Sequence, residues 1–406
     1  MKPAADPGAR IALVVILAGV AAALHIAKLP PAVPVLQREL GITLVQAGFL
    51  LSLVQLASMA LGIVAGLVGD GIGLRRSMLM GLALLTAAGF AGGFAHEVQT
   101  LLVLRAVEGL GFLMTTVPAP SLIARSVRPA SRTRVLGFWG AFMPLGTALA
   151  LLAGPDVMAL IDWNGWWWLI AAISLAMAAW LARSVPPDPP RAATGDHGWP
   201  RRLRRTLGAR GPWLVALSFA VYSAQWLSVI GFLPALYAAS GWSGTLGAVL
   251  TAAVAAINMV GNIAAGRLLS RGVAPRRVLW AAFAAMAVGV FLAFATPTEQ
   301  APVLRYGGAL LFSCLGGMIP GALFGLAPRL APDAQTVSPT MGWMLQWSAI
   351  GQFVGPPLVA WVASLAGGWQ WTWVILGLCS LCGAGLAWAL QRQLQRTEAK
   401  GGAYSA

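Results

Sequence analysis

Long apolar runs, separated by short connectors rich in charged, glycine or proline residues, follow one another along almost the whole chain. About twelve such runs occur, at residues 11–36, 43–68, 78–95, 98–124, 134–155, 165–183, 212–238, 244–269, 277–295, 302–328, 338–363 and 369–391. A helix needs about 20 apolar residues to cross a bilayer, so this pattern predicts an all-α integral membrane protein with twelve transmembrane helices. No cleavage-site pattern follows the first run, which we therefore expect to be the first helix rather than a removed signal.

The composition also points away from a soluble protein. Of the 406 residues, 58% are apolar and 10% are charged, and the mean hydropathy is +0.77. Soluble globular domains carry about 25% charged residues. The composition therefore excludes an ordinary soluble domain.

The net charge of +15 is divided unevenly between the two expected sides of the membrane. All but four of the 27 lysines and arginines lie in the tails and in alternate connectors; the exceptions are Lys28, Arg38, Arg105 and Arg305. The opposite connectors hold the acidic residues Glu39, Glu97, Asp156, Asp162 and Glu299. Cytoplasmic loops are enriched in Lys and Arg, so we expect a multi-pass protein of a cell inner membrane with both termini cytoplasmic. The charge indicates orientation, and we expect no nucleic-acid partner.

The cysteines and histidines do not form a metal-binding pattern. Cys314, Cys379 and Cys382 all lie in apolar runs, and the Cys-x-x-Cys pair has no histidine or second pair nearby. We interpret them as small packing residues. The three histidines are scattered, so we expect neither a metal nor another cofactor.

One connector combines glycines with charged residues in a recognisable spacing: Gly66, Asp70, Gly73, Arg75 and Arg76. This pattern resembles the cytoplasmic loop between helices 2 and 3 of the major facilitator superfamily of secondary transporters. The usual arginine after the aspartate is Gly71 here, and Leu74 follows Gly73. Arg105 with Gly109 and Gly111 is similar to the superfamily's helix 4 motif.

The resemblance implies that this loop gates the protein. Asp70 near the start of helix 11, around residues 338–340, would gain from the positive end of that helix dipole. With Arg75 and Arg76 bridging, this contact would close the cytoplasmic side. Gly66 and Gly73 would permit the tight turn and the close approach of helices.

The second half of the chain repeats the first at an offset close to 200 residues. Corresponding features include Pro34 and Pro234, Arg105 and Arg305, Gly154-Pro155 and Gly355-Pro356, and the Trp-rich segments 162–168 and 367–373, which we expect at the outer interface. As in the superfamily, this repeat implies two pseudo-symmetric six-helix bundles, at residues 1–184 and 212–406, with the substrate path between them. Residues 185–211 would form a cytoplasmic linker whose arginines face the anionic leaflet.

Predicted helices 1 and 4 together contain four ionisable residues, each of which costs about 2.5–3.5 kcal/mol unless it faces a partner or a cavity. They are His25 and Lys28 in helix 1, and Arg105 and Glu108 in helix 4. Arg105 and Glu108 are three residues apart, which favours an internal ion pair; a proton-sensitive carboxylate or an anion-binding arginine is the functional alternative. Lys28 either snorkels to the outer face or binds substrate, and His25 is either a packing residue or a proton site. If His25, Lys28 and Arg105 all face the cavity, the substrate should be an anion.

Neutral polar residues inside the spans are further candidates for substrate binding. They are Tyr222, Gln225 and Trp226 in helix 7, Asn258 and Asn262 in helix 8, and Gln346 and Gln352 in helix 11. Hydrogen bonds between helices are the alternative role for each of them.

Motifs for ATP hydrolysis and for enzyme catalysis are absent from the sequence. No lysine follows glycine at Walker spacing and no nucleophile–base pair stands out, so we expect neither ATP hydrolysis nor an enzyme. A basic residue in helix 1 before a proline cluster, together with residues 136–143, resembles the cyanate and nitroimidazole transporter branch. The glycine signature of exporters around Gly154-Pro155 is not cleanly present.

The sequence therefore predicts a monomeric secondary transporter that takes up a small anionic solute by alternating access, with protons and membrane lipids as further partners. Efflux of hydrophobic compounds is the alternative among transporters. A membrane sensor that has kept the fold but lost transport is the alternative from another class.

Overall fold

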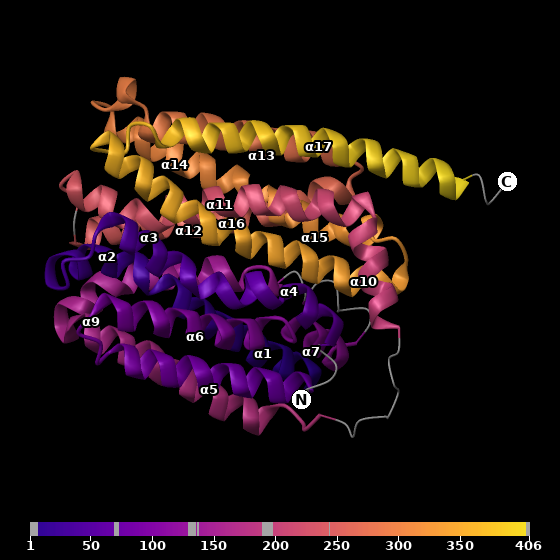
Figure 1. The fold of residues 1–406 in the computed structure, drawn as a ribbon, viewed down its shortest axis with the longest axis horizontal. Coiled ribbons are helices and arrows are strands. Elements are labelled where there is room, and N and C mark those ends of the chain that lie inside the picture. Colours follow the sequence, from indigo (N-terminus) through magenta and orange to yellow (C-terminus); the bar gives the residue numbers. More distant parts are fainter. Residues whose placement is uncertain are drawn as a thin grey trace, which may run out of the picture. The chain divides into compact units, whose positions relative to one another are not determined.

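The structure is a computed structural model that describes residues 7–68, 73–128, 135, 138–188, 198–242 and 244–402. Within these ranges the regular structure consists of α-helices and three short 3-10 turns, with no β-strand (Figure 1). Ten described segments are long and apolar enough to cross a membrane. The segment Phe142–Ser184 contains two helices that meet at a kink, and α5 (Leu74–Gly92) has 19 residues, enough for a further crossing. The predicted all-α integral membrane fold is confirmed, and together these described segments provide enough helical length for twelve crossings.

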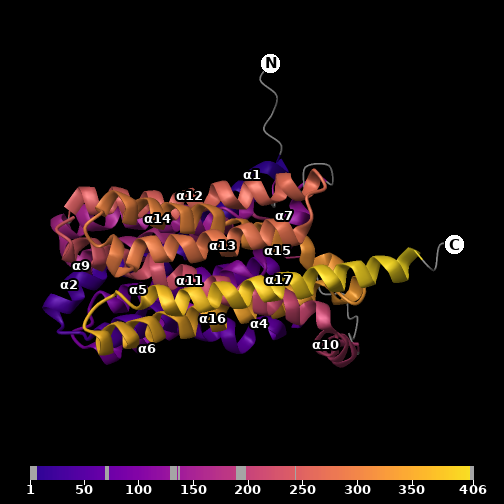
Figure 2. The ribbon, with the colours of Figure 1, turned by 90° about the horizontal axis from the view of Figure 1, so that it is seen from above.

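The chain divides into two compact units, of which the first comprises Met1–Ser58, Val68–Ala193 and Ile230–Ala256. Its helices α1, α5, α6 and α9 run side by side (Figures 1 and 2). The elements that begin in this unit are α1 (Pro7–Ala27), α2 (Leu29–Glu39), α3 (Leu44–Ser52), the 3-10 turn η1 (Leu53–Gln55), α4 (Leu56–Val68), α5, α6 (Val98–Thr116), α7 (Ala119–Ser126), α9 (Phe142–Ser184) and α12 (Gly244–Ser270).

The second unit comprises Met59–Leu67, Thr194–Val229 and Ile257–Ala406. Here α13 lies beside both α14 and α17 (Figure 2). The elements that begin in this unit are α10 (Trp199–Gly208), α11 (Arg210–Ala239), α13 (Pro275–Phe294), η2 (Thr296–Thr298), α14 (Pro302–Gly316), α15 (Met318–Leu330), η3 (Ala334–Thr336), α16 (Val337–Ala366) and α17 (Thr372–Gly402).

Prolines and glycines interrupt several of the apolar runs. The first run breaks at Lys28, because Pro30 and Pro31 follow directly and carry no amide N–H for an intrahelical bond. The run at 98–124 likewise divides before Pro118 into α6 and α7, and the run at 302–328 divides at Gly317. The chain therefore has more helical segments than apolar runs.

The two helices inside α9 meet without a loop. Ile161 and Asp162 depart from helical geometry, and Asp162 adopts a left-handed conformation with φ 57°. A non-glycine residue is uncommon in this region. The kink replaces the connector that the sequence suggested between the runs at 134–155 and 165–183.

The buried core of the first unit is made from the inward faces of α1, α5, α7 and α9, with residues such as Val15, Leu82 and Leu122 almost fully covered. Many large apolar side chains instead lie on the outside, including Leu160, Val303 and Leu381. A soluble monomer rarely exposes so much apolar surface. Lipid chains would cover these residues in a membrane.

Candidate functional site

Glu108 is the centre of a buried polar cluster in the first unit. Its Oε1 accepts from Lys28 Nζ at 2.5 Å and lies 2.9 Å from His25 Nδ1, while its Oε2 accepts from Arg105 Nη1 at 2.6 Å. All four side chains are at most 1% exposed. The structure thus brings together the four ionisable residues of predicted helices 1 and 4.

The break between α1 and α2 places Lys28 at the cluster. Lys28 is the residue between the two helices, and its carbonyl accepts from Trp166 Nε1 at 3.0 Å. Its ammonium lies 4.7 Å from the centre of the Trp167 ring, within range of a cation–π interaction. Lys28 is fully buried, so in this conformation it does not snorkel to the surface.

Arg105 fixes α6 to two other helical segments. Its Nε donates to the Leu50 carbonyl at 3.0 Å, and its Nη1 donates to the His25 carbonyl at 2.5 Å as well as to Glu108. Its Nη2 is buried without a hydrogen-bond partner among the described residues. One strong donor of the cluster therefore lacks an acceptor.

His25 connects Glu108 to Ser174, a polar residue of α9. Because a carboxylate only accepts, His25 Nδ1 donates to Glu108, and Nε2 lies 2.8 Å from the Ser174 hydroxyl. That hydroxyl can donate to a neutral imidazole or accept from a protonated one. The pair can therefore accommodate a change of protonation without moving.

The charges of the cluster do not balance. Lys28 and Arg105 contribute two positive charges and Glu108 contributes one negative charge, so the cluster carries a net charge of about +1 when His25 is neutral. Buried charges are costly unless they are paired. One further negative charge would therefore balance the charge of the cluster.

Three tryptophans of the segment from Asp162 to Trp168 lie next to this cluster. Trp163, Trp166 and Trp167 are at most 3% exposed. Trp166 and Trp167 enclose Lys28.

A second group of predicted residues meets in the second unit. Asn258 Nδ2 donates to the Tyr222 hydroxyl at 3.1 Å and to the Ser313 carbonyl at 2.9 Å, and Asn262 Nδ2 donates to Asn258 Oδ1 at 3.1 Å. The three predicted residues therefore form one network that joins α11, α12 and α14.

Three other candidates of this unit, Gln225, Gln352 and Trp226, lie outside this network. Gln225 accepts from the Ser380 hydroxyl at 2.8 Å, and Gln352 donates to Ser348 at 3.3 Å. Ser348 in turn lies 2.7 Å from the Ser223 hydroxyl. Trp226 is buried, and its Nε1 has no hydrogen-bond partner among the described residues.

Gln346, a predicted substrate-binding residue, contacts the backbone of α4 in this conformation. Its Oε1 accepts from the Ile63 amide at 2.8 Å and its Nε2 donates to the Met59 carbonyl at 2.7 Å. A Cβ on Gly62 would lie 2.7 Å from Gln346 Cβ, so only glycine permits this approach. In this conformation the side chain of Gln346 is occupied by α4.

Asp188, a residue that the sequence does not single out, holds the basic end of the predicted gating motif at Arg75 and Arg76. Asp188 accepts from the amides of Arg75 and Arg76, at 3.2 and 3.0 Å, and from Arg125 Nη2 at 3.2 Å. It therefore caps the first turn of α5. Burial by itself raises the pKa of Asp188, but the two amides and the Arg125 guanidinium outweigh burial and hold this pKa below its usual value.

Gly73 makes the cap possible. It precedes α5 with φ 94°, a left-handed conformation that suits glycine, and a Cβ there would lie 2.6 Å from Asp188 Oδ2. Arg75 also donates from Nη2 to the Ala182 carbonyl at 2.7 Å. Gly66 lies within α4, and Asp70 lies outside the described residues.

Several residues of these sites were not predicted. Ser174 was visible as a polar residue within an apolar run, and Asp188 as a carboxylate between two proline pairs. Neither signal shows which distant residue is its partner, because both contacts join segments about 110 to 150 residues apart.

Comparison with known proteins assigns the fold and the family. A profile of the Major Facilitator Superfamily matches residues 11–344. A solved bacterial homologue of the human lysosomal transporter Spinster, in an inward-facing and unoccupied conformation, aligns over 98% of this chain and 99% of that one. The TM-score is 0.78 at 16% sequence identity, which supports the same fold.

Relatives whose names state a function are consistent with membership of this family. Monocarboxylate transporter 11 of Homo sapiens is 28% identical over 80% of this chain and 72% of its own length. The puromycin resistance protein pur8 of Streptomyces alboniger is 29% identical over 48% of this chain and 38% of its own length. Several relatives are matched over only 23–38% of their own lengths. Because the superfamily profile covers well over half of the chain, this multi-pass membrane protein belongs to the Major Facilitator Superfamily.

Proposed function

We propose that the protein is a secondary active transporter that carries a small anion across the cell inner membrane by alternating access, as a monomer with cytoplasmic termini. One observation supports the anion most directly. The Glu108 cluster has an excess positive charge, and Arg105 Nη2 is a buried donor without an acceptor. An anion with carboxylate-like oxygens would supply both the missing charge and the missing acceptor.

The same cluster suggests coupling to protons. Glu108 and an entering anion would compete for Lys28 and Arg105. A proton on Glu108 removes its negative charge and frees both cations for the anion, whereas loss of that proton restores the ion pairs and favours release. His25 would exchange this proton with Glu108, and Ser174 would remain the second hydrogen-bond partner of the imidazole.

Residues of the second unit would complete the substrate path in other states of the cycle. We assign this role to the Tyr222, Asn258 and Asn262 network, to Gln225 and Gln352, and to Trp226, whose buried N–H lacks a partner. Asp70, with Gly66, Gly73, Arg75 and Arg76, would gate the cytoplasmic side.

Efflux of hydrophobic compounds is the second candidate. It is favoured by relatives named for resistance, such as the puromycin resistance protein and methyl viologen resistance protein SmvA of Salmonella typhimurium. The relatives named as monocarboxylate transporter and 4-methylmuconolactone transporter favour uptake of a small organic solute. Experiment also distinguishes these two functions from a sensor without transport and from the narrower branch of cyanate and nitroimidazole transporters.

Reconstituted protein in liposomes separates these functions. We expect labelled small carboxylates to accumulate when the outside is acidified, and Lys28→Ala and Arg105→Ala to reduce the rate by at least about tenfold, because each removes a charge-assisted hydrogen bond worth ~1.5–3 kcal/mol. Arg305→Ala is the matched control, since Arg305 occupies the corresponding place in the second repeat and bonds only the Ala295 carbonyl at 3.3 Å among the described residues.

The outcomes distinguish the alternatives. Export of hydrophobic dyes without carboxylate uptake would establish the efflux function. No movement of any solute by well-folded protein would favour the sensor. Equal losses in Arg105→Ala and Arg305→Ala would remove the special role of the Glu108 cluster.

A further inference from the structure

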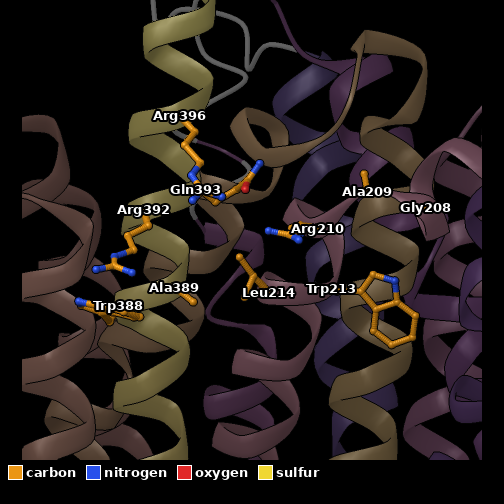
Figure 3. Close-up of a pocket in the computed structure, with 10 residues that line it drawn as sticks. All are labelled: Gly208, Ala209, Arg210, Trp213, Leu214, Trp388, Ala389, Arg392, Gln393 and Arg396. Carbon is orange, nitrogen blue, oxygen red and sulfur yellow. The ribbon is translucent and has the colours of Figure 1, made fainter.

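A pocket lined by arginines opens at the junction of α10 and α11, beside the end of α17. Its volume is about 470 Å³, and the lining residues are Gly208, Ala209, Arg210, Trp213, Leu214, Trp388, Ala389, Arg392, Gln393 and Arg396. Figure 3 shows Arg396 and Gln393 extending from α17 towards the space beside Arg210. The proposed transport cycle uses none of these residues.

The three arginines of this pocket have no anionic partner among the described side chains. Arg210, Arg392 and Arg396 form no salt bridge and no hydrogen bond with other described side chains, in contrast to Arg205, which pairs with Asp333 at 2.9 Å. Arg392 stacks on the Trp388 ring at 3.5 Å, an arrangement that orients its guanidinium but does not neutralise it. Three like charges gathered around one cavity favour an anionic occupant.

The walls of the pocket are held in place. Trp213 Nε1 donates to the Leu207 carbonyl at 2.8 Å, which closes the turn between α10 and α11. The Trp213 ring also packs edge-on against Trp343, with ring centres 4.9 Å apart. The site is therefore preformed rather than a chance gap between loops.

The pocket combines a basic rim with an apolar floor. Leu214, Trp388 and Ala389 lie below the arginines (Figure 3). Trp388 is 41% exposed, and the apolar span of α17 ends at Arg396. Tryptophan and arginine at the end of a span are typical of the membrane interface. A ligand with both a phosphate and a hydrocarbon part fits this arrangement better than a free phosphate.

We propose that this pocket binds the phosphate head group of an anionic phospholipid, with the start of an acyl chain against Trp388 and Leu214. A bound lipid would join the α10–α11 turn to α17. The proposal goes beyond the transport function and does not depend on the identity of the substrate.

Lipid retention and thermal protection test this proposal. Purified protein is titrated with phosphatidylglycerol or phosphatidylcholine in detergent, and the melting midpoint and the co-purified lipid are measured. We expect phosphatidylglycerol to protect the native chain more than phosphatidylcholine does. Its apparent affinity should fall about fivefold for each arginine removed in R210Q/R392Q/R396Q, because a basic residue near the membrane surface contributes ~1 kcal/mol.

The variant R271Q/R276Q/R277Q is the matched control. It removes the same charge from another basic connector, where Arg276 also stacks on a tryptophan, Trp280, at 4.9 Å. If both triple variants lose the same affinity for phosphatidylglycerol, the effect comes from surface charge in general, and the proposal is overturned. Equal protection by inorganic phosphate would assign the pocket to soluble anions and overturn the lipid. The single variant R396Q provides the same comparison if the triple variant does not fold.

Discussion

Glu108 shows how much a single buried residue can organise. Three basic side chains, His25, Lys28 and Arg105, converge on its carboxylate. All four side chains are at most 1% exposed, so water does not screen their charges. The stability of this cluster therefore depends on keeping the carboxylate charged or neutralising a cation together with it.

Replacing Glu108 alone should be strongly destabilising. Glu108→Gln leaves Lys28 and Arg105 buried without a counter-charge, and loss of one member of a buried pair typically costs ~3–5 kcal/mol. The double variant Lys28→Met/Glu108→Gln keeps the net charge of the cluster, so we expect it to recover a large part of this loss. Denaturant titration of the purified proteins in detergent measures both values, and a double variant no more stable than Glu108→Gln would contradict the argument.

Asp188 should stabilise the start of α5 in a pH-dependent manner. Asp188→Ala removes an N-terminal cap and is expected to lower the free energy of unfolding by ~1 kcal/mol at neutral pH. Since the pKa of Asp188 is lowered in the folded state, its contribution is present above the unfolded value near ~3.9 and is lost as the pH falls through the lower folded value.

Thermal unfolding of Asp188→Ala and the native chain across this pH range tests the cap. Their difference should shrink below about pH 4. Glu97→Ala is the control, because Glu97 occupies the residue before α6 without a side-chain cap bond. A difference that persists unchanged at low pH would show that Asp188 acts through packing rather than charge.

Local spacing made part of the site predictable. Arg105 and Glu108 are three residues apart on one helix, so their ion pair follows from the sequence. The contacts of Glu108 with His25 and Lys28 cross about 80 residues, and their geometry depends on how α1 and α6 pack. The contact of Gln346 with α4 could not be predicted for the same reason, because its amide suits a substrate and a helix backbone equally well.

At the level of elements, the amide of Gln346 bonds to two backbone groups of α4 that lie four residues apart, the Ile63 amide and the Met59 carbonyl. In a regular α-helix these two groups also bond to each other. A side chain that enters this hydrogen-bond ladder can bend a helix. The short 3-10 turn η1, just before α4, lies in the same irregular stretch.

Gln346→Ala should loosen this junction. We expect faster hydrogen exchange at Ile63 and a loss of about 1–2 kcal/mol in stability, because two hydrogen bonds are removed. Gln352→Ala is the control on the same helix, since Gln352 bonds to Ser348 of α16 itself. Unchanged exchange at Ile63 in Gln346→Ala would show that α4 does not depend on the amide.

At the level of the whole molecule, hydropathy predicted the number of crossings well because lipid imposes one length on every span. It did not predict where the spans are interrupted. The junctions at Lys28 and at Gly317 reflect proline and glycine chemistry in a tertiary setting, and the kink at Asp162 arises at a non-glycine residue that carries no such signal.

Reporter fusions test the proposed orientation of the membrane spans. Alkaline phosphatase, which needs an oxidising compartment for its disulfides, should be active when fused in the connector at Glu299 and inactive when fused after Arg271. A green fluorescent protein fused to the C-terminus should be fluorescent. The reverse pattern at Glu299 and Arg271 would invert the assignment of the two faces.

The turn at Asp162 has no loop, and this limits how the length of the following helix can change during evolution. Ser174, the partner of His25, lies twelve positions after Asp162 in the sequence. Each residue added to or removed from this stretch would rotate the rest of the helix by about 100° and carry the serine hydroxyl away from the imidazole. Descendants of this gene can therefore exchange side chains in that interval, but length changes there should be purged unless the histidine is lost as well.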